Sequence, residues 1–219
     1  IDDQGAMIQL EHKPERILTL AMGTDSIVLG ILPEEKLIAI NSLADDPVSS
    51  NIVDKANGIT RKIKNPSAEE ILSLKPDVVF IYNWGKAEMV DNLRELGIKV
   101  VVVKGPKSIA DVKENVKLIA KTLGEEDKGN IIAQLGEVLN EYAHFYLVDV
   151  TGLNAATTSA MRRKCFQSEI KMVVVKNTLL HKALEAAETD YTPLYDCLKG
   201  TTAVLFANTA NAPAKLLKD

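Results

Sequence analysis

Short runs of apolar residues alternate with amphipathic segments along the first 124 residues of the chain. Four runs rich in Ile, Val and Leu are expected to form strands: residues 16–21, 37–40, 78–82 and 98–103. Unbroken apolar runs of this length are typical of strands that are buried on both faces of a parallel sheet. Because helical segments separate these runs, the pattern predicts a doubly wound α/β lobe over residues 1–124.

Capping residues and helix breakers place the helices of this lobe. The first helix is expected to run from Ser26 to Leu32, with Thr24 or Asp25 as its N-cap. The polar stretch over residues 41–65 is expected to be mostly loop. Three further helices are expected over residues 65–74, 86–96 and 109–123, and a glycine closes each of the last two.

The rest of the chain predicts a second, smaller module. Residues 125–142 have apolar side chains at helical spacing and are expected to form a long connecting helix. Beyond that helix, three strands and three helices are expected: strands at 145–150, 172–175 and 202–206, and helices at 155–166, 178–187 and from 212 onward. The predicted fold class is α/β, with a doubly wound parallel-sheet lobe joined by this helix to an α/β (α+β) module over residues 143–219.

Composition and charge limit the classes of protein to consider. Of the 219 residues, 46% are hydrophobic and 26% are charged, which excludes a disordered chain, and no apolar run reaches the ~18 residues that a membrane-spanning helix needs. The net charge is −4, so the chain as a whole is a poor partner for nucleic acid. However, residues 1–50 hold nine acidic and three basic residues, while residues 151–219 hold six acidic and nine basic residues. This asymmetry indicates two modules with different partners.

Motifs for catalysis and for metal binding are missing from the sequence. There is no GxGxxG, Walker or GxSxG motif. The histidines and cysteines do not have the spacing of a metal site: His12, His144, His181, Cys165 and Cys197. The two cysteines are expected to be buried free thiols. We therefore expect a protein that is not an enzyme, with no bound metal of its own and no intrinsic cofactor.

Several sequence blocks in the first module resemble those of one family. They are residues 2–5 (DDQG), 13–20 (KPERILTL) and 66–79 (PSAEEILSLKPDVV), with Leu96-Gly97-Ile98 before the next strand. In order and spacing they resemble the substrate-binding proteins of ABC importers for iron–siderophore, haem and cobalamin, over residues 1–127. The resemblance implies the N-terminal lobe of such a protein, a metal chelate as ligand and an ABC importer permease as partner. It also implies a place in the periplasm or on the outer side of the cytoplasmic membrane.

The resemblance also implies where the ligand binds. Matched by position, the ligand-binding loops of the family fall at residues 22–25 and 82–86, after two strands. The ligand-binding residues are expected to be Met22, Thr24, Tyr82, Trp84 and Lys86. Trp84 is the only tryptophan, and its ring beside Tyr82 suits stacking on a planar chelate or macrocycle. Lys86 would meet an anionic group of the ligand. From the residues alone, packing remains an alternative for Met22, and so do a loop-covering role for Trp84 and a solvated one for Lys86.

Blocks in the second module resemble a different family. They are residues 145–153 (FYLVDVTGL), 162–164 (RRK), 174–180 (VVKNTLL) and 198–204 (LKGTTAV). They resemble the stalk-base protein of the bacterial large ribosomal subunit, the tenth in the large-subunit series, over residues 126–219. The resemblance implies a cytoplasmic domain that binds ribosomal RNA. The given sequence stops before the final strand and C-terminal helix of that family, so we expect an incomplete domain that does not bind the stalk dimers.

Six residues of this module are the candidates for RNA contact: Arg162, Arg163, Lys164, Lys176, Asn177 and Lys199. Lys171 and Lys182 would extend the same phosphate-binding surface. The alternatives are a solvated basic surface for the cations and a helix cap for Asn177 and Thr178.

Three hypotheses on the whole chain stay open from the sequence. The first is a chimeric binding protein, with the join near residues 126–128 and residues 145–219 standing where a second lobe would be. The second is a ribosomal RNA-binding protein that carries the first module as a passenger. The third is a scaffold of recombined lobes that has neither activity.

Overall fold

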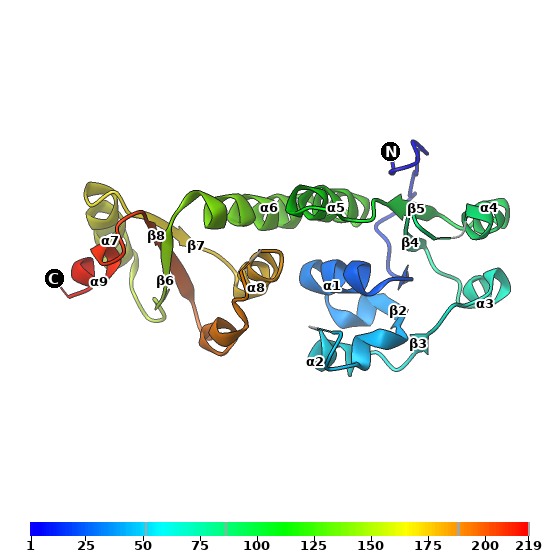
Figure 1. The fold of residues 1–219 in the computed structure, drawn as a ribbon, viewed down its shortest axis with the longest axis horizontal. Helices are drawn as coiled ribbons and strands as arrows, with labels where there is room; N and C mark the ends of the chain where they lie inside the picture. Colours follow the sequence, from blue (N-terminus) through cyan, green and yellow to red (C-terminus); the bar gives the residue numbers. More distant parts are fainter. Residues whose placement is uncertain (51, 86, 188, 219) are drawn as a thin grey trace. The chain divides into compact units, whose positions relative to one another are not determined.

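The structure is a computed structural model that describes residues 1–50, 52–85, 87–187 and 189–218. The chain divides into two compact units, Ile1–Gly129 and Asn130–Asp219 (Figure 1). Each unit has its own sheet. Within the described ranges, no helix combines the length and the apolar character needed to cross a membrane.

The first unit is built on a parallel sheet with the strand order β3-β2-β1-β4-β5. The strands are β1 (Ile17–Thr19), β2 (Leu37–Asn41), β3 (Lys62–Ile63), β4 (Val78–Tyr82) and β5 (Val100–Val103). Ile17 in β1 pairs with Leu37 of β2 on one side and with Val78 of β4 on the other. The sheet is therefore wound in both directions from β1, in agreement with the doubly wound fold predicted from the apolar runs.

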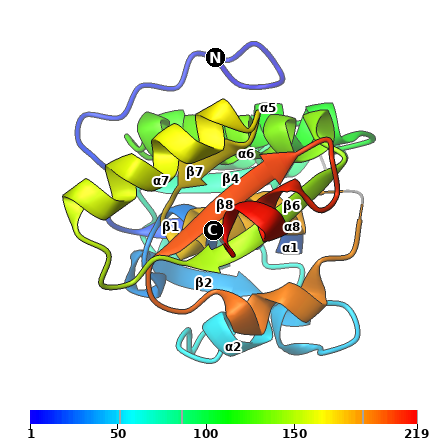
Figure 2. The same cartoon turned by 90° about the vertical axis from the view of Figure 1, so that its left-hand side faces the viewer.

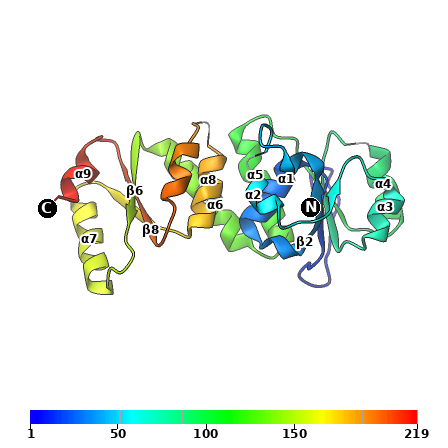
Figure 3. The same cartoon turned by 90° about the horizontal axis from the view of Figure 1, so that it is seen from below.

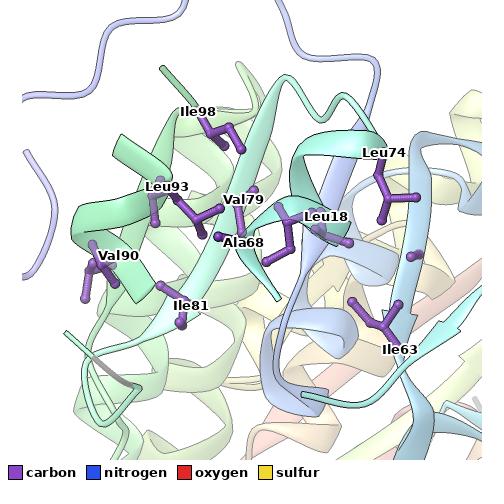
Figure 4. Close-up of a cluster of buried hydrophobic side chains, with 13 residues drawn as sticks. Leu18, Ile63, Ala68, Leu74, Val79, Ile81, Val90, Leu93 and Ile98 are labelled. Carbon is purple, nitrogen blue, oxygen red and sulfur yellow. The ribbon is translucent and has the colours of Figure 1, made fainter. Parts of the chain in front are cut away.

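Helices cover both faces of this sheet. They are α1 (Met22–Ile31), α2 (Val53–Ala56), α3 (Ala68–Ser73), α4 (Ala87–Glu95) and α5 (Ile109–Thr122), with the short 3-10 helices η1 (Glu34–Lys36) and η2 (Ser42–Asp45). α1 and α5 lie together on one face, and α3 and α4 lie together on the other (Figures 1 and 3). Figure 4 shows the core beneath α3 and α4, where Ala68 and Leu93 pack with Val79 of the interior strand β4.

Local sequence signals set several of the helix ends. Ser67 and Ser108 are the N-caps of α3 and α5, and each hydroxyl accepts a hydrogen bond from a backbone N–H three residues later, at 3.2 Å. Gly97 follows α4 with a φ of 81°, a conformation that lets a glycine terminate a helix at little cost. The end of α4 and the start of α5 agree with the sequence-based expectations, whereas α3 begins at Ala68 and not at residue 65.

The first helix begins earlier than predicted. α1 starts at Met22 instead of Ser26, and its N-cap is Ala21, which makes no side-chain capping bond. The hydroxyl of Thr24 lies inside the helix and donates to the backbone carbonyl of Ala21 at 2.7 Å. Thr24 is therefore not the N-cap, and the capping rule misplaced the helix by one turn.

The stretch predicted as loop, residues 41–65, contains η2, α2 and the strand β3. β3 has only two residues, Lys62 and Ile63, which pair with Ile40 and Asn41 of β2. A strand this short has no measurable period in the sequence, so the prediction missed it.

The second unit contains an antiparallel sheet with the strand order β6-β8-β7. Its strands are β6 (His144–Asp149), β7 (Lys171–Val174) and β8 (Thr202–Ala207). Its helices are α7 (Ala155–Gln167), α8 (Asn177–Glu185) and α9 (Ala212–Leu216), with the 3-10 helix η3 (Thr192–Cys197). The boundary between the units falls inside α6 (Glu126–Glu141), the helix expected to connect the modules.

Two apolar clusters hold the layers of the second unit together. Phe206 of β8 packs with Leu180 of α8 on one face of the sheet. Leu205 of β8 packs with Met161 and Cys165 of α7 on the other face, where α9 also lies (Figures 2 and 3). The predicted strands and helices are found within one or two residues of their expected bounds, whereas η3 was not predicted.

Candidate functional site

A pocket of about 440 Å³ lies at one edge of the five-stranded sheet in the first unit. All five strands are parallel, so their carboxyl ends meet at this edge. The pocket is lined by Leu20, Ala21, Asn41, Ile63, Asn65, Pro66, Ile81, Tyr82, Trp84, Gly85 and Met89. β1 and β4 are the neighbours at which the strand order reverses, and the crevice beyond such a switch point is where open α/β sheets bind ligands.

Two aromatic rings form one wall of this pocket. Tyr82 is the last residue of β4 and is 6% exposed, while Trp84 follows it in the loop and is 67% exposed. Their ring centroids are 4.4 Å apart and their planes are inclined by 45°. Trp84 therefore presents a broad apolar surface to solvent beside a ring that is fixed by packing.

Gly105, after β5, makes room for the indole of Trp84. A Cβ atom at position 105 would collide with the six-membered ring of Trp84. The backbone N–H of Gly105 also donates to Oδ1 of Asn83 at 3.0 Å. The loops after β4 and β5 are therefore joined directly under the exposed indole.

A buried carboxyl group lies behind the pocket. Asp25 of α1 is fully buried, accepts a hydrogen bond from the hydroxyl of Thr19, and accepts another from the backbone N–H of Asn41 at 3.2 Å. Burial raises the pKa of Asp25 to about 7, although Thr19, Asn41 and the charge of Lys62 act in the opposite direction. Burial and the charge of Asp25 in turn raise the pKa of Tyr82. Asn41 lines the pocket, so Asp25 is one hydrogen bond away from its wall.

The structure brings two of the five predicted ligand-binding residues together in the pocket, Tyr82 and Trp84. Met22 is half-buried at the start of α1 and is not among the lining residues. Thr24 is fully buried, with its hydroxyl bonded to the Ala21 carbonyl, and it does not line the pocket either. Lys86 lies outside the described residues.

Sequence reasoning missed several lining residues. Asn41 and Ile63 end strands at the same edge, but Ile63 belongs to the unpredicted strand β3. Asn65 and Met89 come from the segments before α3 and within α4. The end of a strand is a usable signal for Asn41, whereas the other positions depend on how the helices pack.

The six predicted RNA-binding residues fall into two places in the second unit. Arg162, Arg163 and Lys164 are exposed on α7. Lys176 and Lys199 are also exposed, and the two segments that carry them are joined by the side chain of Asn177. Its Nδ2 donates to the backbone carbonyl of Gly200 at 3.1 Å.

Three expectations for this unit are wrong. Asn177 does not cap α8, because the helix begins at Asn177 itself and the N-cap is Lys176, with no side-chain bond. Lys182 is buried and pairs with Glu185, so it is not part of an exposed phosphate-binding surface. Cys165 is buried, but Cys197 is exposed. In the described part of the chain, no three His, Cys, Asp or Glu side chains are grouped as metal ligands.

Comparison with known proteins divides the chain in two. The family model "Periplasmic binding protein" matches residues 23–142, and the model "Ribosomal protein L10" matches residues 123–219. Large ribosomal subunit protein uL10 of Christiangramia forsetii is 48% identical over 94 residues, which are 43% of this chain and 54% of that protein. The chain thus spans about half the length of the curated relatives it matches.

Two solved structures of binding proteins have a fold similar to that of this chain. The heme binding protein HmuT matches with a TM-score of 0.51 and 24% identity, over 64% of this chain and 43% of that chain. The molybdate periplasmic binding protein MolA of Haemophilus influenzae, solved with molybdate bound, matches with a TM-score of 0.54 and 16% identity, over 76% of this chain and 53% of that chain. At these identities the similarity shows the fold alone.

Proposed function

Because the chain belongs to the periplasmic binding protein family over residues 23–142, we propose that its first unit captures a small metal chelate without transforming it. The ligand class is a ferric siderophore, haem or a corrinoid. The chain is a chimera, in which this region is followed by one similar to ribosomal protein L10. The observation that carries the proposal is the Tyr82–Trp84 ring pair in a pocket at the switch point of the sheet.

The chemistry of the pocket supports a ligand with a flat apolar face. Trp84 offers an exposed ring surface, with the ring of Tyr82 packed against it, and Asn41 and Asn65 offer amide groups that would fix the orientation of the ligand. No Lys, Arg or His side chain is found among the described residues that line the pocket. The described lining thus offers ring surface and amide hydrogen bonds, in agreement with a chelate whose metal is already enclosed.

Trp84 fluorescence tests this proposal, because Trp84 is the only tryptophan. The intact chain would be titrated with haemin, cyanocobalamin and ferrioxamine, with correction for absorption by the ligand. We expect saturable quenching by one chelate, and about tenfold weaker binding by Tyr82→Ala. Trp84→Ala would be followed by the absorption band of the chelate, and Leu43→Ala removes an exposed apolar side chain outside the pocket as the control. Saturable binding that both ring variants leave unchanged, or no saturable binding, would refute the proposal.

The partners and location follow from the same proposal. A chelate-binding first unit would deliver its ligand to an ABC importer permease outside the cytoplasmic membrane, with Lys86 as a further candidate contact of the ligand. The chelate would be cargo, so the protein would need no cofactor of its own.

A second candidate function, binding of ribosomal RNA in the cytoplasm, is supported by the 48% identity with uL10 over 94 residues. Its candidate contacts are Arg162, Arg163, Lys164, Lys176, Asn177 and Lys199. Binding to a fragment of large-subunit RNA from the stalk base would be measured over a salt series. We expect the affinity to fall steeply with salt, and Arg162→Ala with Arg163→Ala to make this dependence shallower. An affinity that salt does not change would contradict RNA binding.

A further inference from the structure

Phe166, in the last turn of α7, has its ring in solvent. It is 85% exposed, more than Trp84 at 67%. The same helix buries Cys165 and packs Met161 against the sheet, so Phe166 is not on the face that α7 uses for the core. Burying a phenyl ring stabilises a protein, and this ring, left in water, contributes little to the stability of the fold.

Two arginines share this outer face. Arg162 and Arg163 precede Phe166 by four and three residues, which places all three side chains on neighbouring positions of the helix surface. Both arginines are exposed. Across residues 1–50, 52–85, 87–187 and 189–218, neither takes part in an ion pair. The face therefore combines an exposed aromatic ring with two cations that have no acidic partner.

The charge of α7 is entirely positive. Its sequence, AATTSAMRRKCFQ, contains three basic residues and no Asp or Glu. The first acidic residue after the helix in the sequence is Glu169, beyond the end that carries Phe166. A polyanion lying on α7 would therefore place its charges toward Arg162 and Arg163 rather than past Phe166.

We propose that an unpaired RNA base stacks on Phe166 while Arg162 and Arg163 contact the phosphates next to that base. The proposal rests on the RNA-binding function given above and assigns it a stacking residue. Single-stranded RNA is recognised by aromatic side chains that stack on splayed bases, combined with cations along the backbone. A stacked base would cover the phenyl ring that the protein leaves in water.

A membrane surface and an acidic protein fit this face less well. A helix that lies on a membrane carries several bulky apolar side chains along one stripe. The positions on the same stripe of α7 as Phe166 are small, Ala155 and Ser159, or charged. An acidic peptide would satisfy the arginines but would need no flat ring between them.

The experiment uses the intact chain and a hairpin from the same stalk-base RNA fragment, in which one loop base is replaced by 2-aminopurine, whose fluorescence reports stacking. A duplex of the same stem without the loop is the comparison RNA. We expect the hairpin to bind more tightly than the duplex, with a change in 2-aminopurine fluorescence at saturation. Phe166→Leu should weaken hairpin binding about tenfold and abolish the fluorescence change, while Phe166→Tyr should retain both.

Matched variants separate stacking from charge. Arg162→Ala should reduce the slope of log affinity against log salt concentration by the amount expected for the loss of about one phosphate contact. Phe166→Leu should leave this slope unchanged. Val48→Ala, in the first unit and 93% exposed, is the control for loss of an exposed apolar side chain.

The outcomes distinguish this proposal from the RNA-binding function. If the hairpin binds but Phe166→Leu has the affinity and fluorescence of the parent chain, the stacking proposal is overturned and RNA binding stands. If neither RNA binds, both are overturned. If Phe166→Leu weakens binding to anionic phosphatidylserine vesicles or to a poly-glutamate peptide as much as to the hairpin, the face is not specific for RNA and the proposal also falls.

Discussion

Arg94 of α4 and Asp2 of the N-terminal segment form an ion pair in which Nη2 and Oδ2 lie 2.7 Å apart. The carboxylate of Asp2 is fully buried, and it also accepts hydrogen bonds from the backbone N–H groups of Gln4, Ala6 and Val102. Four donors thus converge on one buried charge. The ion pair and the Val102 bond fix the first residues of the chain to α4 and β5.

Asp2→Ala should therefore destabilise the first unit. Removal of the Asp2 carboxylate leaves the partly buried Arg94 guanidinium without its partner, and it leaves the backbone N–H groups of Gln4 and Ala6 without their acceptor. We therefore expect a loss of about 2–3 kcal/mol in the free energy of unfolding. Urea unfolding followed by Trp84 fluorescence measures this loss, because the only tryptophan lies in the first unit. Glu11→Ala removes the same charge from an exposed position and is the control. An equal effect of the two variants would show that the ion pair is not the cause.

The stability of the first unit should depend on pH through Asp25. Burial raises the pKa of this carboxyl from 3.8 to about 7 in the folded chain, whereas the unfolded chain titrates near the ordinary value. Between about pH 4 and pH 7 the folded chain therefore holds a proton that the unfolded chain has released. Its free energy of unfolding falls as the pH rises through this window, by at most about 1.4 kcal/mol per pH unit, and levels off above it.

Asp25→Asn removes this titration and provides the measurement. Urea unfolding of the parent chain and of the variant would be compared at pH 5 and pH 8. The parent chain should lose stability relative to the variant on going to pH 8, because the amide stays neutral. Equal differences at the two pH values would show that Asp25 does not titrate in this range.

The sequence predicted the parts of the fold that have strong local signals. β4 was predicted with its observed bounds, residues 78–82, because a short, unbroken run of β-branched and aromatic residues favours a buried strand. β3 was missed because its two residues pair only through β2. Thr24 is of the type that caps helices, but its hydroxyl bonds backward from within α1. The first error thus depends on a tertiary pairing, whereas the second arises because a local bond to Ala21 competes with capping.

The lining of the candidate pocket was likewise predicted only in part. Tyr82 and Trp84 were selected because the family resemblance places a ligand-binding loop at residues 82–86 and because their rings suit stacking, and both residues line the pocket. Met89 lines it from α4, whose packing against the sheet no local pattern specifies. The role of Gly105 was also invisible in the sequence, because its contact with Trp84 joins two loops that follow different strands.

Gly105→Ala should move the indole of Trp84. A methyl group at position 105 would collide with the ring, so the ring must leave its place beside Tyr82. We expect a shift in the emission maximum of Trp84 and about tenfold weaker binding of whichever chelate saturates the parent chain. Lys107→Ala changes an exposed residue of the same loop and should alter neither quantity. A Gly105→Ala variant with the emission and affinity of the parent chain would show that the ring tolerates the methyl group.

Asn177→Ala should weaken RNA binding without removing a charge. The Asn177 side chain donates to the Gly200 carbonyl at 3.1 Å and so joins the start of α8 to the loop before β8. Lys176 and Lys199 are the sequence neighbours of these two residues, so loss of the bond should let the lysines separate. We expect several-fold weaker binding, with an unchanged slope of log affinity against log salt concentration. Lys199→Ala should instead reduce this slope by the amount expected for the loss of about one phosphate contact.

The control for Asn177→Ala is Thr178→Ala, which alters the next, exposed residue of α8. The affinity of each variant for the stalk-base RNA fragment would be measured over the same salt series as for the parent chain. Circular dichroism would confirm that α8 is retained. If Asn177→Ala binds as tightly as the parent chain while Lys199→Ala is impaired, the lysines act independently and the Asn177–Gly200 bond does not position them. If Asn177→Ala instead lowers the salt dependence, the bond holds at least one lysine against a phosphate.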